Sequence, residues 1–188
     1  MPDSNEPNDE LAVLGLVASR LEEAGIAYMV TGSVAAAFYA QPRMTRDLDL
    51  VLELRPNQLA TITSLFAEDF LLDEAGMRAA VERQSMFNLI HSAALVKVDI
   101  IVRKDAPYRR EEFRRRRRMQ VAGQAIWAVA AEDLILSKLA WAKAGQSELQ
   151  LRDVRMLLGS ATGLDMEYLE RWAAELGVAG MLQTARTR

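Results

Sequence analysis

The chain contains no cysteine and a single histidine among its 188 residues. Without cysteine it has no disulfides, no thiolate nucleophile and no zinc ribbon, and one histidine excludes histidine-rich metal sites. No apolar run reaches the roughly 18–20 residues that span a bilayer. The first ten residues, MPDSNEPNDE, are acidic and polar, unlike a signal peptide. We therefore expect a cytoplasmic protein with no membrane partner.

The sequence also lacks a strong excess of charge of either sign. Its formal net charge is -3, so nothing in the composition pulls the whole chain toward nucleic acid or membrane. A hydrophobic content of 51% with 26% charged residues is ordinary for a globular protein and excludes wholesale disorder. The pattern along the chain predicts a disordered tail over residues 1–9, an α/β part over 10–130 and a helical part over 131–188.

One stretch, GSVAAAFYAQPRMTRDLD, organises the rest of the chain. Upstream of it, residues 26–31 (IAYMVT) have the composition of a strand, which breaks at Gly32 and Ser33 and gives way to a helix rich in small residues. Glycine lets backbone N–H groups approach a phosphate closely, and the N-terminus of a helix favours anions. The pattern indicates phosphate binding at Gly32 and Ser33.

Three aspartates follow this turn in strand-like surroundings. Asp47 and Asp49 open the apolar run LDLVLEL, and on a strand residues i and i+2 point to the same face. Asp99 stands alone inside residues 94–102 (ALVKVDIIV), where an unpaired carboxylate would be costly. If the two strands are neighbours, the three carboxylates converge, and one or two Mg²⁺ ions would neutralise them and support an in-line phosphoryl or nucleotidyl displacement.

These residues carry a resemblance to a known family. A Gly-Ser pair at a strand-to-helix turn, then Asp-x-Asp, then a lone Asp on a later strand resembles the nucleotidyltransferase superfamily, and in particular its small bacterial branch of AbiE-type toxins and minimal nucleotidyltransferases. The resemblance implies that Gly32 and Ser33 bind the triphosphate of a nucleotide substrate. It also implies that Asp47, Asp49 and Asp99 hold magnesium.

Two other interpretations of Asp-x-Asp were weighed against this one. A pair of surface aspartates at a strand start is common, but the Gly-Ser turn upstream and Asp99 downstream make it less favoured here. Nucleotide-sugar glycosyltransferases also use Asp-x-Asp, but the short chain and the helix between Gly32 and the acids argue against them.

Two charged residues of opposite sign are expected on apolar helix faces after residue 130. At 100° per residue, Lys138 falls in the middle of the apolar face of a helix over 132–144, and Asp153 lies between leucines on a helix over 148–159. A structural interpretation is that Lys138 and Asp153 form an ion pair that joins the helices. A functional interpretation is that both line a nucleotide cleft, and the two interpretations are compatible.

The resemblance favours the functional interpretation. The segments KLA at Lys138 and RDVxxL around Asp153 are similar to the third and fourth motifs of the AbiE-type enzymes. There the lysine contacts the nucleotide and the aspartate belongs to the catalytic set, so the resemblance implies the same roles for Lys138 and Asp153.

Three further segments bear on the fold and on partners. Residues 85–92 and 94–102 predict an antiparallel hairpin with His91 at its joint, a turn or edge histidine rather than a catalytic one. Residues 108–118 hold seven arginines, which would suit RNA phosphates or a triphosphate, although the two glutamates favour an ordinary solvated amphipathic helix. Residues 125–130 (AIWAVA) predict a last strand at the edge of the sheet.

The combined prediction is an α+β protein of nucleotidyltransferase-like fold, with a mixed, largely antiparallel sheet, helices on one face, and a helical C-terminal part that closes a cleft over the acids. The expected activity is Mg²⁺-dependent transfer of a nucleoside monophosphate from a nucleoside triphosphate. Asp99 would complete the metal site and act as general base, while Arg46 and Lys138 would neutralise the leaving pyrophosphate.

The acceptor is left open by the sequence. A tRNA 3′ end, a protein hydroxyl and a small molecule such as an antibiotic all remain, and the arginine run tilts the choice toward RNA or protein. The resemblance to AbiE-type toxins would bring an antitoxin as partner. The alternative from another class is a non-catalytic module of the same fold that uses the arginine run to bind RNA or a partner protein.

Overall fold

A computed structural model describes residues 7–41 and 47–187 of the chain. These residues form a seven-stranded sheet in the order β3-β4-β5-β2-β1-β7-β6. The strands are β1 (Tyr28–Thr31), β2 (Asp47–Leu52), β3 (Phe70–Leu72), β4 (Met86–His91), β5 (Lys97–Val102), β6 (Arg117–Val121) and β7 (Gln124–Ala128).

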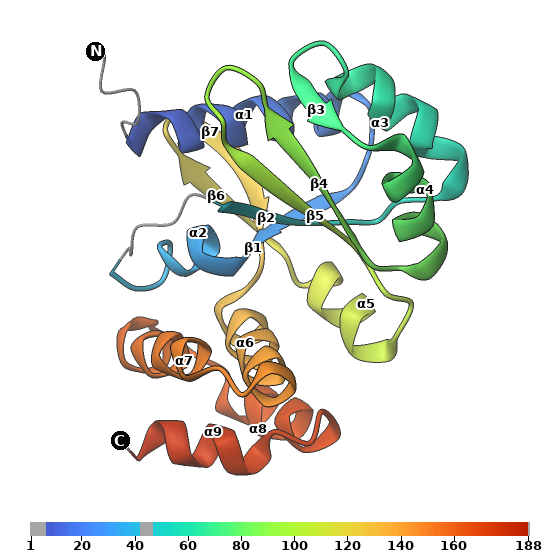
Figure 1. The fold of residues 1–188 in the computed structure, drawn as a ribbon. Helices are drawn as coiled ribbons and strands as arrows, with labels where there is room; N and C mark the ends of the chain where they lie inside the picture. Colours follow the sequence, from blue (N-terminus) through green and yellow to red (C-terminus); the bar gives the residue numbers. More distant parts are fainter. Residues whose placement is uncertain (1–6, 42–46, 188) are drawn as a thin grey trace.

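Helices precede the sheet, connect its strands and make up the C-terminal part of the chain (Figure 1). None of those in the described ranges combines the length and the apolar character that crossing a membrane requires. The helices are α1 (Pro7–Glu23), α2 (Gly32–Ala36), the 3₁₀ turn η1 (Pro56–Gln58), α3 (Leu59–Phe66), α4 (Glu74–Arg83), α5 (Pro107–Arg114), α6 (Ala131–Gly145), α7 (Glu148–Ser160), α8 (Met166–Glu175) and α9 (Ala179–Arg186).

The α+β class and the mixed sheet are confirmed. Four of the pairings between described strands are antiparallel, and two, β2 with β5 and β1 with β7, are parallel. The predicted hairpin is the antiparallel pair β4–β5. The prediction that the last strand lies at the edge is wrong, because β7 pairs with β1 on one side and β6 on the other. The arginine-rich β6 takes the edge instead, where charged side chains stay in water and discourage further pairing.

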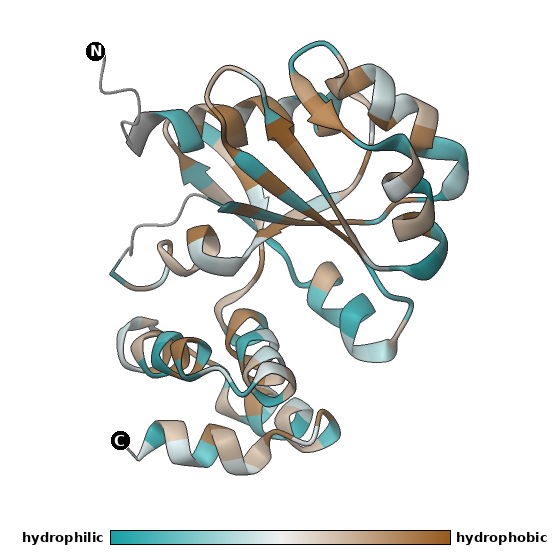
Figure 2. Ribbon diagram, in the orientation of Figure 1, coloured by the Kyte–Doolittle hydropathy of each residue, from teal (hydrophilic) through white to brown (hydrophobic). Residues whose placement is uncertain are grey.

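The two faces of the sheet differ in burial. In β2, Leu48, Leu50 and Leu52 are buried, whereas the alternate residues are exposed or half-buried. The buried side packs with apolar residues of α1, α3 and α4 into one core, and Figure 2 shows how strongly apolar the central strands are. The opposite side, called the acid face below, carries Asp47, Asp49 and Asp99. The period-2 pattern of the sequence therefore separates a core side from a functional side.

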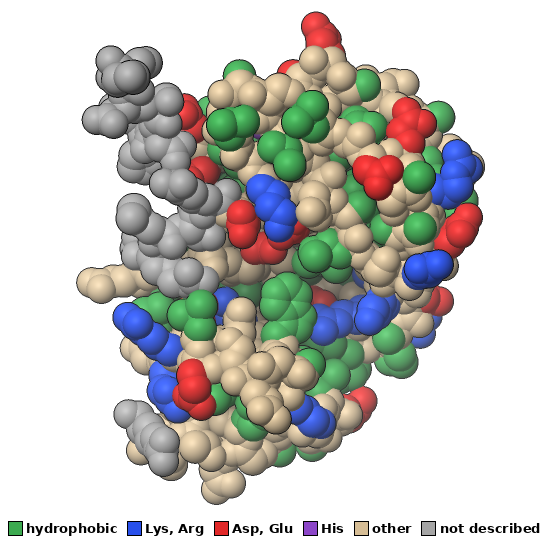
Figure 3. Space-filling view, viewed as in Figure 1, with side chains coloured by type: hydrophobic (Ala, Val, Ile, Leu, Met, Phe, Trp, Pro, Cys, Tyr) green, Lys and Arg blue, Asp and Glu red, His purple; other side chains and the backbone are tan. Residues whose placement is uncertain are grey.

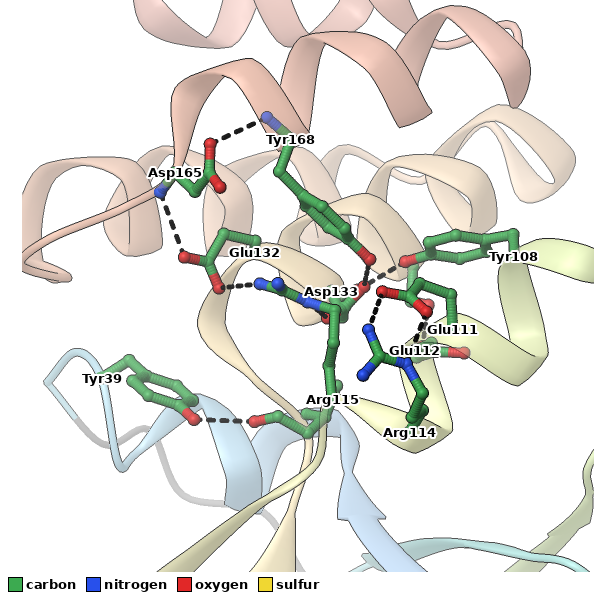
Figure 4. A network of polar contacts seen from close by, with 12 residues as sticks. Tyr39, Tyr108, Glu111, Glu112, Arg114, Arg115, Glu132, Asp133, Asp165 and Tyr168 are labelled. Atoms are coloured by element: carbon green, nitrogen blue, oxygen red, sulfur yellow. Dashed lines mark hydrogen bonds and ion pairs between the residues drawn. The ribbon is translucent and has the colours of Figure 1, made fainter.

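Every described helix after β7 belongs to a C-terminal layer that lies below the sheet in Figure 1. A polar network fastens this layer to the sheet (Figure 4). Arg115 donates from Nε to Asp133 Oδ2 over 2.9 Å and from Nη2 to Glu132 Oε2 over 3.1 Å. The Tyr168 hydroxyl donates to Asp133 Oδ1 over 2.6 Å, and the Arg115 guanidinium lies 3.8 Å from the Tyr168 ring centroid. Burial raises the pKa of Asp133 to about 6, although Tyr168 and Arg115 oppose the rise.

The arginine run is divided between two elements rather than forming one helix. Its first part is α5, which buries Tyr108, Glu112 and Phe113, and its last part is the edge strand β6. Most of its arginines are paired with carboxylates inside the protein. Arg115 holds the C-terminal layer, and Arg118 bonds Glu22 of α1 over 2.6 Å. Two arginines of the run therefore join separate parts of the fold, while Arg109, Arg110 and Arg114 form ion pairs within or next to α5.

Candidate functional site

The parallel pairing of β2 and β5 brings two of the predicted acids side by side. Their register places Asp49 opposite Asp99 and Asp47 opposite Lys97. Since β1 pairs Thr31 with Asp49, and β4 pairs Asn88 with Asp99, one polar row crosses four neighbouring strands. Neighbouring strands lie about 4.8 Å apart, so two carboxylates share a short stretch of this row.

The acids repel one another and are partly withdrawn from water. Burial, followed by the charges of Asp99 and Asp47, raises the pKa of Asp49 to about 6, against the smaller opposing effects of Lys138 and Lys97. Each neighbouring negative charge disfavours ionisation of Asp49. A cation at this point would relieve the repulsion.

Lys97 is a site residue that sequence reasoning missed. Its Nζ lies 2.9 Å from each carboxylate oxygen of Asp99, and this contact with Asp99 is the main cause that raises the pKa of Lys97. On the other side, Asn88 donates to Asp99 Oδ1 over 3.1 Å when its amide nitrogen faces the acid. The alternation in Lys97-Val98-Asp99 already placed the lysine on the same face as Asp99, and this was the available signal.

The donor set fits a hard divalent cation. The predicted ligands are all carboxylates, and Mg²⁺ prefers oxygen ligands. Within residues 7–41 and 47–187, however, no three His, Cys, Asp or Glu side chains stand close enough together to share an ion as they are arranged. The strand register sets Asp49 directly beside Asp99, and Asp47 lies at the exposed start of β2, two residues before Asp49 on the acid face.

Gly32 approaches Asp49 more closely than any other residue type would allow. Its φ is +67°, in the left-handed region, and a Cβ at this position would collide with Asp49 Oδ2 and lie 2.7 Å from Asp49 Cγ. Ser33 follows at the start of α2 and is buried. The helix α2 ends at Ala36, and the chain continues in turns to Ala40.

The predicted ion pair between the two C-terminal helices is confirmed. Lys138 Nζ of α6 lies 2.7 Å from Asp153 Oδ2 of α7, and it also donates to Gln150 Oε1 over 3.2 Å. Both charged side chains are buried. Lys138 also lines a small cavity of about 50 Å³ together with Gly32, Ser33 and Asp49. The fold therefore brings the Gly-Ser turn, one acid and the predicted lysine to one place.

The other residues singled out in the sequence lie outside the small cavity or outside the described ranges. Arg46 lies outside the described residues. Asp153 is the partner of Lys138 rather than part of the cavity wall. His91 is a turn histidine as predicted, because its Nδ1 accepts from Ala94 N over 3.1 Å and its ring packs on Phe70. Figure 3 shows acidic side chains gathered near the middle of this side of the molecule, above a hollow bordered by Lys and Arg side chains.

Comparisons with known proteins identify the fold that carries this site. Neither a protein-family model nor a curated protein matches the sequence. Among solved structures, an antigenic nucleotidyltransferase-like protein from Paracoccidioides brasiliensis superposes with a TM-score of 0.58, covering 94% of this chain and 92% of that one at 18% identity. The fold is that of the nucleotidyltransferases.

Two further nucleotidyltransferase folds support this assignment. A protein from Thermotoga maritima whose nucleotidyltransferase function is itself only an assignment gives a TM-score of 0.55 over 92% of this chain and 98% of that chain at 15% identity. The antibiotic-resistance enzyme ANT(2")-Ia, in complex with adenylyl-2"-tobramycin, gives 0.60 over 89% and 97% at 12% identity. At such low identities the likeness establishes the nucleotidyltransferase fold, and the chemistry has to be argued from the residues of this chain.

Proposed function

We propose that the protein is an Mg²⁺-dependent nucleotidyltransferase that moves a nucleoside monophosphate from a nucleoside triphosphate to an acceptor hydroxyl. The observation that carries the proposal is the register of β2 and β5, which sets Asp49 beside Asp99 on the acid face. The Gly-Ser turn and Lys138 meet Asp49 in the same small cavity. A nucleotidyltransferase fold built around these residues supports nucleotidyl transfer over the other uses of paired acids.

The triphosphate would be held by the turn and by the C-terminal helices. Backbone N–H groups at Gly32 and Ser33 would approach the β- and γ-phosphates, because both residues line the small cavity beside Asp49 and glycine has no side chain to shield its backbone. Lys138, fixed by Asp153, stands in the same cavity and neutralises charge on the leaving pyrophosphate. Arg46, which directly precedes Asp47 in the sequence, would also neutralise charge on the leaving pyrophosphate.

The acids would organise the reacting centre. Mg²⁺ held by Asp47, Asp49 and Asp99 would supply charge neutralisation of the triphosphate and of the transition state. Asp99, held in place by Lys97 and Asn88, accepts the proton of the acceptor hydroxyl. The hydroxyl oxygen then bonds to the α-phosphorus as the bond to pyrophosphate breaks.

The ion pairs of the arginine run make RNA and protein less favoured as acceptors than the sequence suggested. The arginine run favoured RNA or protein, but most of its arginines are occupied by ion pairs within the chain. The same finding weakens the proposal of a non-catalytic RNA-binding module. The fold neighbour ANT(2")-Ia was crystallised with an adenylylated small molecule, adenylyl-2"-tobramycin, which favours a small-molecule acceptor. Membership of the AbiE-type branch, with an antitoxin partner, rests on the resemblance of the KLA and RDVxxL segments alone.

A transfer assay tests the proposed function. The protein is incubated with each labelled nucleoside triphosphate, Mg²⁺, total RNA and cell extract, and the label is followed onto RNA, protein and small molecules. We expect label transfer that requires Mg²⁺ and disappears in Asp49→Asn. The control Glu74→Gln removes one exposed carboxylate on α4 and should transfer like the wild type. Absence of both transfer and Mg²⁺-dependent nucleotide binding would refute the proposal.

A further inference from the structure

The proposed nucleotide site draws its residues from two layers of the molecule. Gly32 and Asp49 belong to the sheet and its first strand-to-helix turn, whereas Lys138 belongs to α6 of the C-terminal layer. The ion pair with Asp153 does not fix Lys138 relative to the sheet, because Asp153 lies on α7 of the same layer. The position of Lys138 in the small cavity therefore depends on what holds α6 against the sheet.

The segment around α5 contacts α6 at two successive turns. At the first turn of α6, Arg115 bonds the side chains of Asp133 and Glu132 (Figure 4). The Tyr108 hydroxyl donates to the backbone oxygen of Asp133 over 3.2 Å. Asp133 is therefore held through both its side chain and its backbone.

A second set of contacts follows one turn further along α6. Arg109 Nη1 donates to Ser137 Oγ over 2.6 Å, and Ser137 Oγ donates to Glu112 Oε1 over 2.5 Å. Since Ser137 follows Asp133 by four residues, which is about 40° around the helix, the two residues form one strip along α6. This strip is the side of α6 that α5 and Arg115 hold.

Lys138 lies on a different side of α6 from the held strip. At about 100° per residue, it stands about 140° around the helix from Asp133. A shift on one side of the helix therefore reaches the other side as a rotation about the helix axis. A rotation of about 10° moves a group at the outer radius of a helix, about 6 Å, by about 1 Å. Loss of the contacts at Asp133 would thus displace Lys138 by enough to weaken a charged contact with a phosphate.

Arg115 neutralises two carboxylates that are withdrawn from water. The side chain of Asp133 is 0% exposed, and that of Glu132 is 4% exposed. Without the guanidinium, both would lose the cation that bonds them while they stay buried, which is strongly unfavourable. A rotation of α6 that carries Asp133 toward water would reduce this cost. Removal of Arg115 is therefore expected to move the helix as well as to destabilise the protein.

The contacts of Arg115 lie apart from the cavities at the acids. The small cavity adjoins a larger one of about 330 Å³, since Thr31, Ser137 and Trp141 border both. Arg115 and Asp133 are not among the described residues that line either cavity. An effect of Arg115 on a bound nucleotide would therefore pass through α6 rather than through direct contact.

We propose that Arg115 is a positioning residue of the nucleotide site. By bonding the two acids at the start of α6, it fixes the rotation of this helix and thereby holds Lys138 in the small cavity. The proposal rests on the proposed function, because it takes Lys138 as a group that binds the triphosphate. It adds a residue that sets the nucleotide affinity without touching the nucleotide.

Arg20 offers a matched control, because it makes the same kinds of contact elsewhere in the fold. It donates to Asp69 Oδ1 over 2.6 Å and to Asp69 Oδ2 over 2.7 Å, and its guanidinium lies 5.7 Å from the Phe66 ring centroid. Its side chain is 23% exposed, against 21% for Arg115. It joins α1 to the turn between α3 and β3, away from α6. Arg20→Met should therefore lower the stability without moving Lys138.

The test measures binding and stability side by side. Dissociation constants in Mg²⁺ are determined by calorimetry for ATP, GTP, CTP, UTP and inorganic tripolyphosphate with the wild type, Arg115→Met, Arg115→Lys and Arg20→Met. Each titration is run well below the melting temperature of the variant, which is measured by thermal melting. An affinity loss then reports on the folded site rather than on unfolding.

We expect Arg115→Met to bind its nucleotides and tripolyphosphate about tenfold more weakly than the wild type. Arg20→Met should bind them like the wild type, although both variants melt at a lower temperature. Arg115→Lys keeps the positive charge but not the planar fork that bonds two carboxylates at once, so it should melt close to the wild type and bind about threefold more weakly. This variant also carries the test if Arg115→Met does not fold.

Wild-type affinity in Arg115→Met would overturn the proposal. Equal affinity losses in Arg115→Met and Arg20→Met would overturn it as well, because the effect would then follow stability alone. Wild-type affinity in Arg115→Lys would assign any loss in Arg115→Met to charge rather than to the position of α6. If the wild type binds neither tripolyphosphate nor any nucleotide with Mg²⁺, the proposed function itself fails, and this outcome differs from all of the others.

Discussion

Replacing Gly32 with alanine probes the contact between the Gly-Ser turn and the acids. Gly32 has a φ of +67°, and a Cβ there would lie 2.7 Å from Asp49 Cγ and 2.9 Å from Asp49 Cβ. The left-handed backbone by itself costs an alanine about 1 kcal/mol. The collision adds to this cost, because Asp49 or the turn must move to relieve it. We expect a total loss of about 2–4 kcal/mol in the free energy of unfolding.

A second glycine separates the two effects. Gly163 has a φ of +68°, but a Cβ at this position would meet nothing within 4 Å. Gly163→Ala should therefore cost only about 1 kcal/mol in urea denaturation. It should leave Mg²⁺-dependent nucleotide binding intact.

The functional consequence is specific to Gly32. Displacement of Asp49 should weaken Mg²⁺-dependent binding of nucleoside triphosphates at least about tenfold in Gly32→Ala, since a shift of an ångström at a charged site is enough. The reasoning is refuted if Gly32→Ala and Gly163→Ala lose equal stability and Gly32→Ala binds nucleotide like the wild type.

Three further predictions concern buried and cleft charges. Lys138→Met should lower the free energy of unfolding in urea by about 3–5 kcal/mol, because Asp153 loses its buried ion pair. The double variant Lys138→Met/Asp153→Leu should recover most of this stability but should still not bind nucleotide. Recovery of both stability and nucleotide binding would exclude Lys138 from the cleft. Since the pKa of Asp133 is raised to about 6 in the folded state, its contribution to stability is complete below about pH 4 and is lost as the pH rises through 6. The free energy of unfolding of the wild type should thus fall relative to Asp133→Asn by up to about 3 kcal/mol between pH 4 and 7, and parallel pH profiles would contradict this. Lys97→Met removes an ammonium group that competes with a metal ion, so EPR should show Mn²⁺ binding to the nucleotide-free protein about fivefold more tightly. The control Lys104→Met should leave the Mn²⁺ affinity unchanged. Equal Mn²⁺ affinities in the two variants would argue against competition.

Patterns that depend on neighbours along the chain were readable from the sequence. Apolar runs predicted the strands that carry Asp49 and Asp99, and the two-residue repeat of a strand placed Asp47 and Asp49 on one face. The helical period likewise placed Lys138 and Asp153 on apolar faces, which predicted their ion pair, now seen at 2.7 Å. A buried charge demands a partner, so two opposite buried charges on successive helices point to each other.

Other features required the strand order, which no local pattern encodes. Only the parallel pairing of β2 with β5 brings Asp49 beside Asp99, and only the pairing of β7 with both β1 and β6 moves the predicted edge strand inside the sheet. The glutamates within the arginine run already indicated the local ion pairs of Arg109 and Arg114, but those of Arg115 and Arg118 gave no local sign, because their partners Asp133 and Glu22 are remote in sequence.

The sequence by itself determined the chemistry that is available: three aspartates in strand-like runs, a glycine at a strand-to-helix turn, and a lysine on an apolar helix face. The tertiary structure decided how these groups meet, which acids are neighbours, and that a cavity of about 330 Å³ lies beside them. The physical reason is that side-chain periodicity is set by local backbone geometry, whereas register and cavities arise from packing between segments that are distant along the chain.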